Sequence, residues 1–223
     1  MSTRSIFVTG TDTGVGKTRV ACALLHAYAA RGLRVVGMKP VAAGGDIRNG
    51  LLMNDDVVQL MAASTVAAPL AWVNPYCFAA PIAPHIAADS EKKYIEIKYL
   101  LNSFQQLSAL AEVVVVEGAG GFCVPLNEVE TSADLAQQLA LPVVLVVGLR
   151  LGCLNHTLLT LEAIHARGLT LAGWVANHID AAMPHADANV AALTARIDAP
   201  LLGRIAFNAD ADAADIARQL VVP

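Results

Sequence analysis

The chain has 223 residues, of which 56% are hydrophobic and 15% are charged, and its formal net charge at pH 7 is −4. This composition excludes an intrinsically disordered chain and is typical of a globular protein with a large core, so we expect one domain over residues 1–223. The acidic balance and the lack of a run of Lys or Arg count against nucleic acid or an anionic membrane as the main partner.

Short apolar runs alternate with stretches of helical periodicity along the chain. The predicted strands cover residues 6–8, 35–41, 71–78, 112–116, 141–148, 169–177 and 201–207. The predicted helices cover residues 19–30, 54–63, 95–110, 131–140, 155–167, 188–196 and 210–220. Strands that alternate with helices in this way predict an α/β fold with a doubly wound, mostly parallel sheet.

Four further features bear on organisation and compartment. Residues 57–88 contain no Asp, Glu, Lys or Arg, but four prolines interrupt them, so we expect a buried helix, a turn and a strand there instead of a membrane span. The first strand begins near the N-terminus and leaves no room for a signal peptide. The four cysteines form no C-x-x-C pair, which indicates reduced thiols and a cytoplasmic protein. Residues 44–52 are expected to form a mobile loop.

Residues 6–18 read IFVTGTDTGVGKT, a strand followed by a Gly-rich loop and the start of a helix. Loop amides and the helix dipole together make a cradle for phosphate. Lys17 can reach a terminal phosphate, and the Thr18 hydroxyl can bind Mg²⁺. The strict P-loop spacing needs Gly where Thr11 stands, with Gly10 one residue further back, so the alternative is an ordinary Gly-rich turn with a surface lysine.

In parallel sheets ligands bind at the carboxyl ends of the strands, so the residues there are the next candidates. Lys39 ends the second predicted strand and is placed to neutralise charge in phosphoryl transfer, although a solvated lysine is the alternative. Glu117 ends a buried strand and can hold Mg²⁺. Asp56 is a second candidate ligand with Asp55 as its rival, and both also suit a helix N-terminus.

The segment Leu-Gly-Cys-Leu-Asn at 151–155 begins another predicted helix. Its amides can bind a carboxylate, and plain helix capping is the commoner explanation of such a segment. The chain has no G-x-S-x-G or other nucleophile motif, so we expect catalysis by positioning and electrostatics around a nucleotide.

Seven segments spread along the chain resemble the dethiobiotin synthetase family, the ATP-dependent ligases of biotin synthesis. They are VTGTDTGVGKT, GMKPVAAG, NPYCFAAPIAPHIAA, VVVVEGAGGFCVPL, LPVVLVVGLRLGCLNH, GLTLAGWVAN and APLLGRI. The longer G-x₅-GKT loop is then expected, because this family carries it. The resemblance implies that CO₂ adds to an amine of 7,8-diaminononanoate (diaminopelargonate), that ATP phosphorylates the carbamate to a mixed anhydride, and that the second amine closes the ureido ring of dethiobiotin.

The resemblance also implies roles for individual residues. Lys17 and Lys39 match the catalytic lysines, and Thr18, Asp56 and Glu117 match the Mg²⁺ ligands. The matched ATP contacts, with Asn177 at the adenine, are Thr13, Gly14, Val15, Gly16, Gly118, Ala119, Gly120, Asn177, His178, Ala206, Phe207 and Asn208. The matched substrate contacts are Ala43 and, for the carboxylate, a segment from the neighbouring subunit of a homodimer: Gly152, Cys153, Leu154 and Asn155.

Three positions depart from the family pattern. Ala43 replaces a Ser that contacts substrate, Ala206 replaces a common Pro, and Gly14 replaces a frequent Glu. Individual contacts change at these positions while the implied reaction is retained.

Three other functions remain as rivals. A ParA/MinD-like ATPase needs a loop lysine where Asp12 stands, and the chain lacks a basic amphipathic tail. An amidoligase-type enzyme that activates a carboxylate is disfavoured by the KPVA segment. A degenerate nucleotide-binding scaffold is disfavoured by the intact set of Lys17, Thr18, Asp56 and Glu117.

Overall fold

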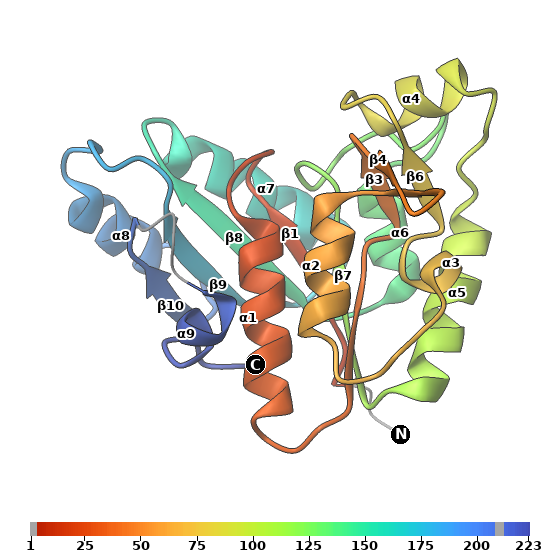
Figure 1. Ribbon diagram of the computed structural model, residues 1–223. Coiled ribbons are helices and arrows are strands. Elements are labelled where there is room, and N and C mark those ends of the chain that lie inside the picture. Colours follow the sequence, from red (N-terminus) through yellow and green to blue (C-terminus); the bar gives the residue numbers. More distant parts are fainter. Residues whose placement is uncertain (1–3, 208–211) are drawn as a thin grey trace.

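The computed structural model describes residues 4–207 and 212–223. At its centre lies a six-stranded sheet in the order β10-β9-β8-β1-β7-β2, with every adjacent pair parallel (Figure 1). Its strands are β1 (Ile6–Gly10), β2 (Val35–Met38), β7 (Val113–Glu117), β8 (Val143–Leu149), β9 (Leu171–His178) and β10 (Leu201–Ile205). The predicted parallel α/β architecture is therefore confirmed.

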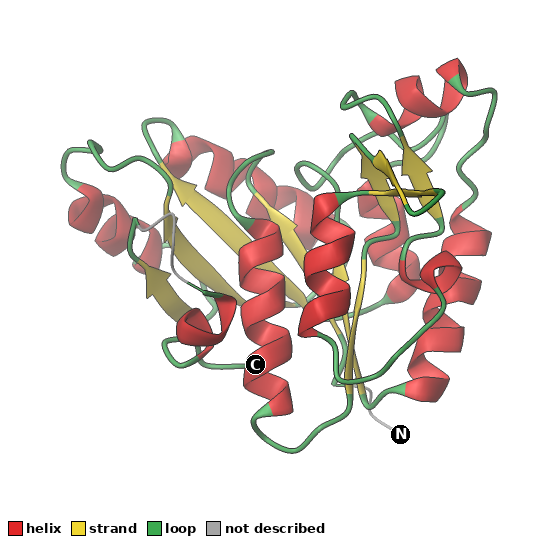
Figure 2. Cartoon of the chain, viewed as in Figure 1, coloured by secondary structure: helices red, strands yellow, loops and turns green. Residues whose placement is uncertain are grey.

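Helices cover both faces of this sheet (Figure 2). On one face lie α1 (Lys17–Ala29) and α9 (Ala213–Ala217), with α2 (Asp55–Ala63) packed beside α1. On the other face lie α5 (Ile97–Leu110), α6 (Ser132–Leu139), α7 (Cys153–Ala166) and α8 (Ala186–Thr194).

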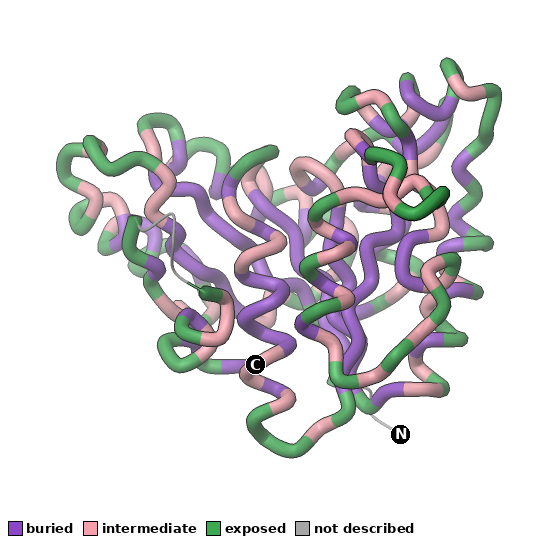
Figure 3. Tube along the Cα trace, in the orientation of Figure 1, coloured by how far each residue is buried: buried purple, intermediate pink, exposed green. Residues whose placement is uncertain are grey.

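The central strands are mostly apolar because both of their faces are buried (Figure 3). In β1, Ile6 and Val8 pack into the core beneath α1, while Phe7 points to the core on the opposite face. Full burial of one such side chain contributes about 1.5–3 kcal/mol, so the buried strands contribute strongly to the folding free energy. Its rigidity fixes the strand ends that carry the polar residues.

A group of smaller elements extends the carboxyl edge of the sheet next to β2 (Figure 1). A parallel pair joins β3 (Val41–Ala43) to β6 (Tyr76–Phe78), and an antiparallel hairpin joins β4 (Asp46–Arg48) to β5 (Leu51–Met53). Two short helices, α3 (Leu70–Val73) and α4 (Pro84–Ser90), complete this region.

Three sequence-based expectations are wrong in this region. The strand expected over residues 35–41 ends at Met38, and the chain enters a different sheet at Val41, because Pro40 lacks the N–H that a ladder needs. The strand expected over 71–78 is α3 followed by β6. The loop expected over 44–52 contains the β4–β5 hairpin.

The remaining elements agree with the expectations to within a few residues at their ends. The helix expected over 210–220 is α9, although residues 210 and 211 lie outside the described part of the chain. Within residues 4–207 and 212–223 no helix combines the length and the hydropathy that crossing a bilayer requires.

Asn54 joins the fold to the functional edge. Its Oδ1 accepts a hydrogen bond from the N–H of Asp56 at 2.9 Å and so caps α2. Its Nδ2 donates to the carbonyls of Ala43 and Gly44, both at 3.1 Å. One side chain thereby ties the start of α2 to the turn after β3.

We expect Asn54→Ala to lower the free energy of unfolding by about 2 kcal/mol, since it removes a helix cap and leaves two carbonyls without a donor. Urea unfolding followed by circular dichroism measures the change. Asn102→Ala, at an exposed position of α5, is the control and should stay within about 0.5 kcal/mol of the unmodified chain. Equal effects of the two changes would contradict the tying role of Asn54.

Candidate functional site

The loop between β1 and α1 has the shape of a phosphate cradle. Gly14 and Gly16 have φ of +74° and +87°, the left-handed region in which glycine is favoured. A Cβ on Gly16 would lie 2.2 Å from Nδ2 of Asn177, which itself donates to the Val15 carbonyl at 2.8 Å. The loop is therefore held against the end of β9, and Gly16 is required for two independent reasons.

Lys17 begins α1 and folds back over the loop. Its Nζ donates to the backbone carbonyl of Asp12 at 2.9 Å, and the residue is buried. Burial and, next, the nearby ammonium of Lys39 lower the pKa of Lys17 to about 8. An anion that enters the loop restores the charged form, so the site favours a ligand with several negative charges.

Lys39, Asp56, Glu117 and Thr18 form one hydrogen-bonded cluster beside Lys17. Nζ of Lys39 donates to Oε1 of Glu117 at 2.6 Å and to Oδ2 of Asp56 at 2.8 Å. The Thr18 hydroxyl donates to the same Glu117 oxygen at 2.8 Å. The structure thus brings together four elements of the chain. Glu117 ends β7, Thr18 and Asp56 lie at the starts of α1 and α2, and Lys39 directly follows β2.

Burial makes the charges of this cluster interdependent. Lys39 is 4% exposed and Glu117 is 0% exposed. Burial opposes the charged form of Lys39, but the carboxylates of Glu117 and Asp56 outweigh it and raise the pKa of Lys39. Burial likewise opposes ionisation of Asp56, yet the ammonium of Lys39 holds its pKa below the usual value. Lys39 and Asp56 are therefore both charged at neutral pH.

The structure separates the two adjacent aspartates. Asp56 points into the cluster, whereas Asp55 forms an exposed ion pair with Arg48 of the hairpin. Position in the sequence could not distinguish them, because both lie in the first turn of α2.

The donor set of the cluster fits Mg²⁺. Oε2 of Glu117 is buried and has no hydrogen-bond partner in the described part of the chain, which suits an oxygen that awaits a cation. Mg²⁺ in nucleotide sites is held by one or two carboxylates together with substrate phosphates. Within the described ranges no three His, Cys, Asp or Glu side chains group as an all-protein metal cage.

Two cavities adjoin this cluster and share part of their walls. The first, of about 360 Å³, is lined by Thr13, Gly14, Gly16, Lys17, Thr18, Lys39, Asp56, Glu117 and Gly120. The second, of about 610 Å³, shares Thr13, Lys39, Asp56 and Gly120 with the first. Its other walls are mainly apolar and come from Val41, Ala42, Ala43, Pro81, Ile82, Ala83, Pro84, Ala119, Cys123, Val124 and Pro125. The pair therefore accommodates a polyphosphate beside an aliphatic molecule.

Sequence reasoning identified Ala43 and Ala119 in the apolar walls of the second cavity but not the other wall residues. The stretch from Pro81 to Pro84 and the turn from Cys123 to Pro125 lie far apart in sequence and meet only in the folded chain. The available signal was their place in two of the segments that carry the family resemblance.

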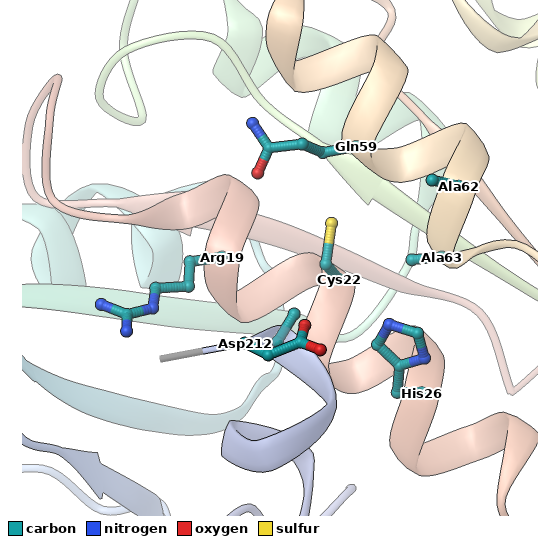
Figure 4. Close-up of a pocket in the computed structure, with 8 residues that line it drawn as sticks. Arg19, Cys22, His26, Gln59, Ala62, Ala63 and Asp212 are labelled. Carbon is teal, nitrogen blue, oxygen red and sulfur yellow. The ribbon is translucent and has the colours of Figure 1, made fainter. Parts of the chain in front are cut away.

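A third cavity, of about 400 Å³, lies between α1, α2 and the start of α9 (Figure 4). Its lining residues are Arg19, Cys22, His26, Gln59, Ala62, Ala63, Asp212 and Ala213. None of the predicted site residues lines it, so the two cavities at the phosphate loop are the candidate site.

The remaining predicted residues that the structure describes lie around the same edge of the sheet. Gly118 donates its N–H to the Val8 carbonyl at 2.9 Å, which holds the turn after β7 against β1. His178 ends β9, Phe207 is half-exposed just after β10 beside Ala206, and Asn208 lies outside the described residues. Gly152 is the N-cap of α7, and neither cavity at the loop is lined by residues 152–155 as far as the described chain shows.

Comparison with known proteins identifies the family. A protein-family model described as an AAA domain matches residues 4–215. The ATP-dependent dethiobiotin synthetase BioD of Aromatoleum aromaticum is 55% identical over 220 residues, which cover 99% of this chain and 98% of the relative. That of Nitrosospira multiformis is 53% identical over 217 residues, covering 97% and 94%. The chain belongs to the dethiobiotin synthetase family.

Solved structures of other proteins share the fold of this dethiobiotin synthetase family member. The MinC:MinD cell division complex of Aquifex aeolicus aligns with a TM-score of 0.56 at 15% identity, covering 96% of this chain and 86% of that one. A ParA family ATPase of Chlorobium tepidum aligns with a TM-score of 0.55 at 12% identity, covering 93% and 86%. At such identities the likeness shows the fold alone.

The cysteines of this family member give a test of the site geometry. Cys123 is exposed and lines the second cavity, whereas Cys22 is buried and burial raises its pKa to about 12. Cys22 is then almost entirely the neutral thiol at pH 8, whereas the thiolate is the reactive form. We expect iodoacetamide to label Cys123 rapidly at pH 8 and to spare Cys22, as peptide mass mapping would show.

Cys123→Ser is the matched control and should abolish the rapid labelling. Rapid modification of Cys22 in the folded chain would contradict the packing of α1 described above.

Proposed function

We propose that this chain is an ATP-dependent dethiobiotin synthetase, a ligase of biotin biosynthesis that uses diaminopelargonate, CO₂ or bicarbonate, ATP and Mg²⁺. The observation that carries this proposal is the convergence of Lys17, Thr18, Lys39, Asp56 and Glu117 beside an apolar cavity, in a chain 55% identical to such an enzyme. One domain over residues 1–223 carries the whole reaction in this proposal.

The proposed reaction has three balanced steps. One amine attacks CO₂ and loses a proton, which forms an N–C bond and a carbamate. A carbamate oxygen attacks the γ-phosphorus of ATP, which forms the mixed anhydride and releases ADP. The second amine attacks the carbamoyl carbon, the C–O bond to phosphate breaks, and the ureido ring closes with release of phosphate and a proton.

The chain contributes position and charge to these steps. The loop amides and Lys17 hold the phosphates. Lys39 lines both cavities, so its ammonium faces the place where a carbamate oxygen meets the γ-phosphate and stabilises negative charge there. Thr18, Asp56 and Glu117 are the residues that would hold Mg²⁺, and the ion would supply positive charge to offset that of the phosphate oxygens.

We propose further that the active form is a homodimer. Residues 152–155 of one subunit bind the substrate carboxylate in the site of the other. Two observations support this arrangement: Leu151 is 97% exposed next to the α7 N-terminus, and that terminus lacks a side-chain cap in the described part of the molecule. A helix start without a side-chain cap offers amides to a carboxylate, although the N–H of Cys153 already donates to the Arg150 carbonyl.

The adenine is assigned to Asn177, His178 and the segment 206–208. The Asn177 Oδ1 is buried and has no partner among the residues described, and an amide oxygen of this kind accepts a hydrogen bond from an exocyclic amine. The cytoplasm is the proposed compartment, because the reaction consumes ATP and the four cysteines are free thiols.

The decisive experiment combines the purified chain with ATP, bicarbonate and diaminopelargonate and detects dethiobiotin by mass spectrometry. Product that depends on all three reactants supports the proposal. ATP hydrolysis that proceeds equally well without diaminopelargonate would favour a regulatory ATPase instead.

Lys39→Met should lower kcat by a factor of about 100 or more, because a positioned charge at the transferred phosphoryl group is lost. It also leaves Glu117 buried without its ammonium, so kcat is measured at a temperature where circular dichroism shows the variant folded. Lys93→Met, which removes an exposed lysine paired with Glu91, is the control and should keep kcat. A kcat loss no larger than the control's would contradict the catalytic role of Lys39.

Glu117→Gln should raise the Mg²⁺ concentration for half-maximal activity about tenfold or more, since a neutral amide is a weaker ligand for a hard cation. A magnesium titration of the initial rate measures the shift. Glu112→Gln changes the carboxylate just before the other end of β7, where it pairs with Arg34, and should leave the titration unchanged. An unaltered curve for Glu117→Gln would assign the metal to other residues.

A further inference from the structure

Asp12 of the phosphate loop is held by three separate contacts. Its Oδ1 accepts a hydrogen bond from the N–H of Thr13 at 2.7 Å, and its backbone carbonyl accepts one from Lys17 Nζ at 2.9 Å. Its Oδ2 forms a hydrogen-bonded ion pair with the guanidinium of Arg150, 138 residues further along the chain. The first two contacts stay within the loop and the start of α1, whereas the third links the loop to the end of β8.

Arg150 directly follows β8 and lies three residues before the start of α7 at Cys153. Its side chain reaches the phosphate loop, and its carbonyl accepts a hydrogen bond at 3.0 Å from the N–H of Cys153, the first residue of α7. One residue therefore contacts both the nucleotide loop and the helix start that the proposed dimer uses for substrate.

The pair has little to do with folding. The side chains of Arg150 and Asp12 are 41% and 45% exposed, and ion pairs so exposed contribute little to the free energy of unfolding. The loop backbone is anchored elsewhere by buried groups, through Asn177 to Val15 and through the N–H of Thr11 to the Val146 carbonyl at 3.1 Å. The loop keeps its overall course without Arg150.

The charge of Asp12 bears on ligand binding instead of folding. A carboxylate in a loop that receives a polyphosphate repels it, and a guanidinium on that carboxylate cancels the repulsion. Lys17 must leave the Asp12 carbonyl to reach a terminal phosphate, and Arg150 and the Thr13 amide then keep Asp12 in place.

We infer that Arg150 is a positioning residue for nucleotide binding. It acts through Asp12, by neutralising that carboxylate and fixing the turn at Thr13, and does not touch the nucleotide itself. The inference rests on the proposed function, because it takes the loop to be the ATP site.

The test measures the Kd of a non-hydrolysable ATP analogue with Mg²⁺ by calorimetry on the full chain, together with KM for ATP and kcat. Arg150→Met should raise Kd and KM about tenfold and change kcat less than about threefold, because it exposes one like charge to the phosphates. The Kd of Arg150→Lys should stay near that of the unmodified chain. The double variant Arg150→Met with Asp12→Asn should have a Kd within about threefold of the unmodified chain. The unpaired charge is gone in this variant, and the amide oxygen still accepts a hydrogen bond from the N–H of Thr13.

Arg167→Met is the matched control, since it removes an Arg–Asp ion pair with Asp134 at the opposite end of α7. Its Kd should be unchanged. A double variant that binds as weakly as Arg150→Met, or more weakly, would overturn the inference by showing that Arg150 acts on the nucleotide directly. An unchanged Kd for Arg150→Met would overturn it as well, and if that variant is unfolded by circular dichroism, Arg150→Gln replaces it.

The two proposals fail in different ways. If the unmodified chain does not bind the analogue, the proposed function fails and this inference fails with it. If the unmodified chain binds the analogue and makes dethiobiotin, and Arg150→Met binds the analogue with the same Kd, only the inferred role of Arg150 is lost.

Discussion

The buried ion pair between Lys39 and Glu117 is the interaction on which the functional edge of this protein depends. Removing each ion from water costs several kcal/mol, and neither charge is tolerable there without the other. The pair forms only because β2 and β7 are adjacent and parallel, so that their carboxyl ends coincide. A buried pair of this kind adds little net stability compared with apolar residues, which indicates that it is retained for the chemistry of the site.

The same pair sets the charge balance of the whole site. Lys39 lies close enough to Lys17 to depress its pKa, while Glu117 and Asp56 hold Lys39 in its charged form. The result is two ammonium groups beside a nest of loop amides, partly balanced by two carboxylates. Such an arrangement is poorly satisfied by water and well satisfied by a triphosphate with its cation.

Much of this site could be predicted from sequence, because a strand, a Gly-rich loop and a helix start in a fixed order constrain the backbone strongly. Lys39 and Glu117 followed from the rule that parallel strands present their last residues at one edge. The choice between Asp55 and Asp56 could not be made in this way, since it depends on Arg48 drawing one aspartate outward. Most residues of the apolar cavity walls were likewise out of reach, because the walls arise from tertiary contacts between distant turns.

The β4–β5 hairpin was missed for a different reason. Asn49 and Gly50 have φ of +52° and +79° between two paired strands, as a two-residue type I′ turn requires. The dipeptide Asn-Gly is a strong hairpin signal, and reading residues 44–52 as a loop overlooked it. The elements α3 and β6 were harder to assign from sequence, because each is only a few residues long and prolines and alanines interrupt residues 66–84.

The shared wall between the two cavities has a practical meaning for inhibitor chemistry. Thr13, Lys39, Asp56 and Gly120 face both spaces, so nothing thicker than one layer of side chains separates them. A phosphonate joined by a short linker to an alkyl chain would occupy both spaces at once, and the first group to bind would present the second at a high effective concentration. Because two dissimilar compartments must be filled together, such a bivalent compound would also discriminate against ATPases that offer only the phosphate half.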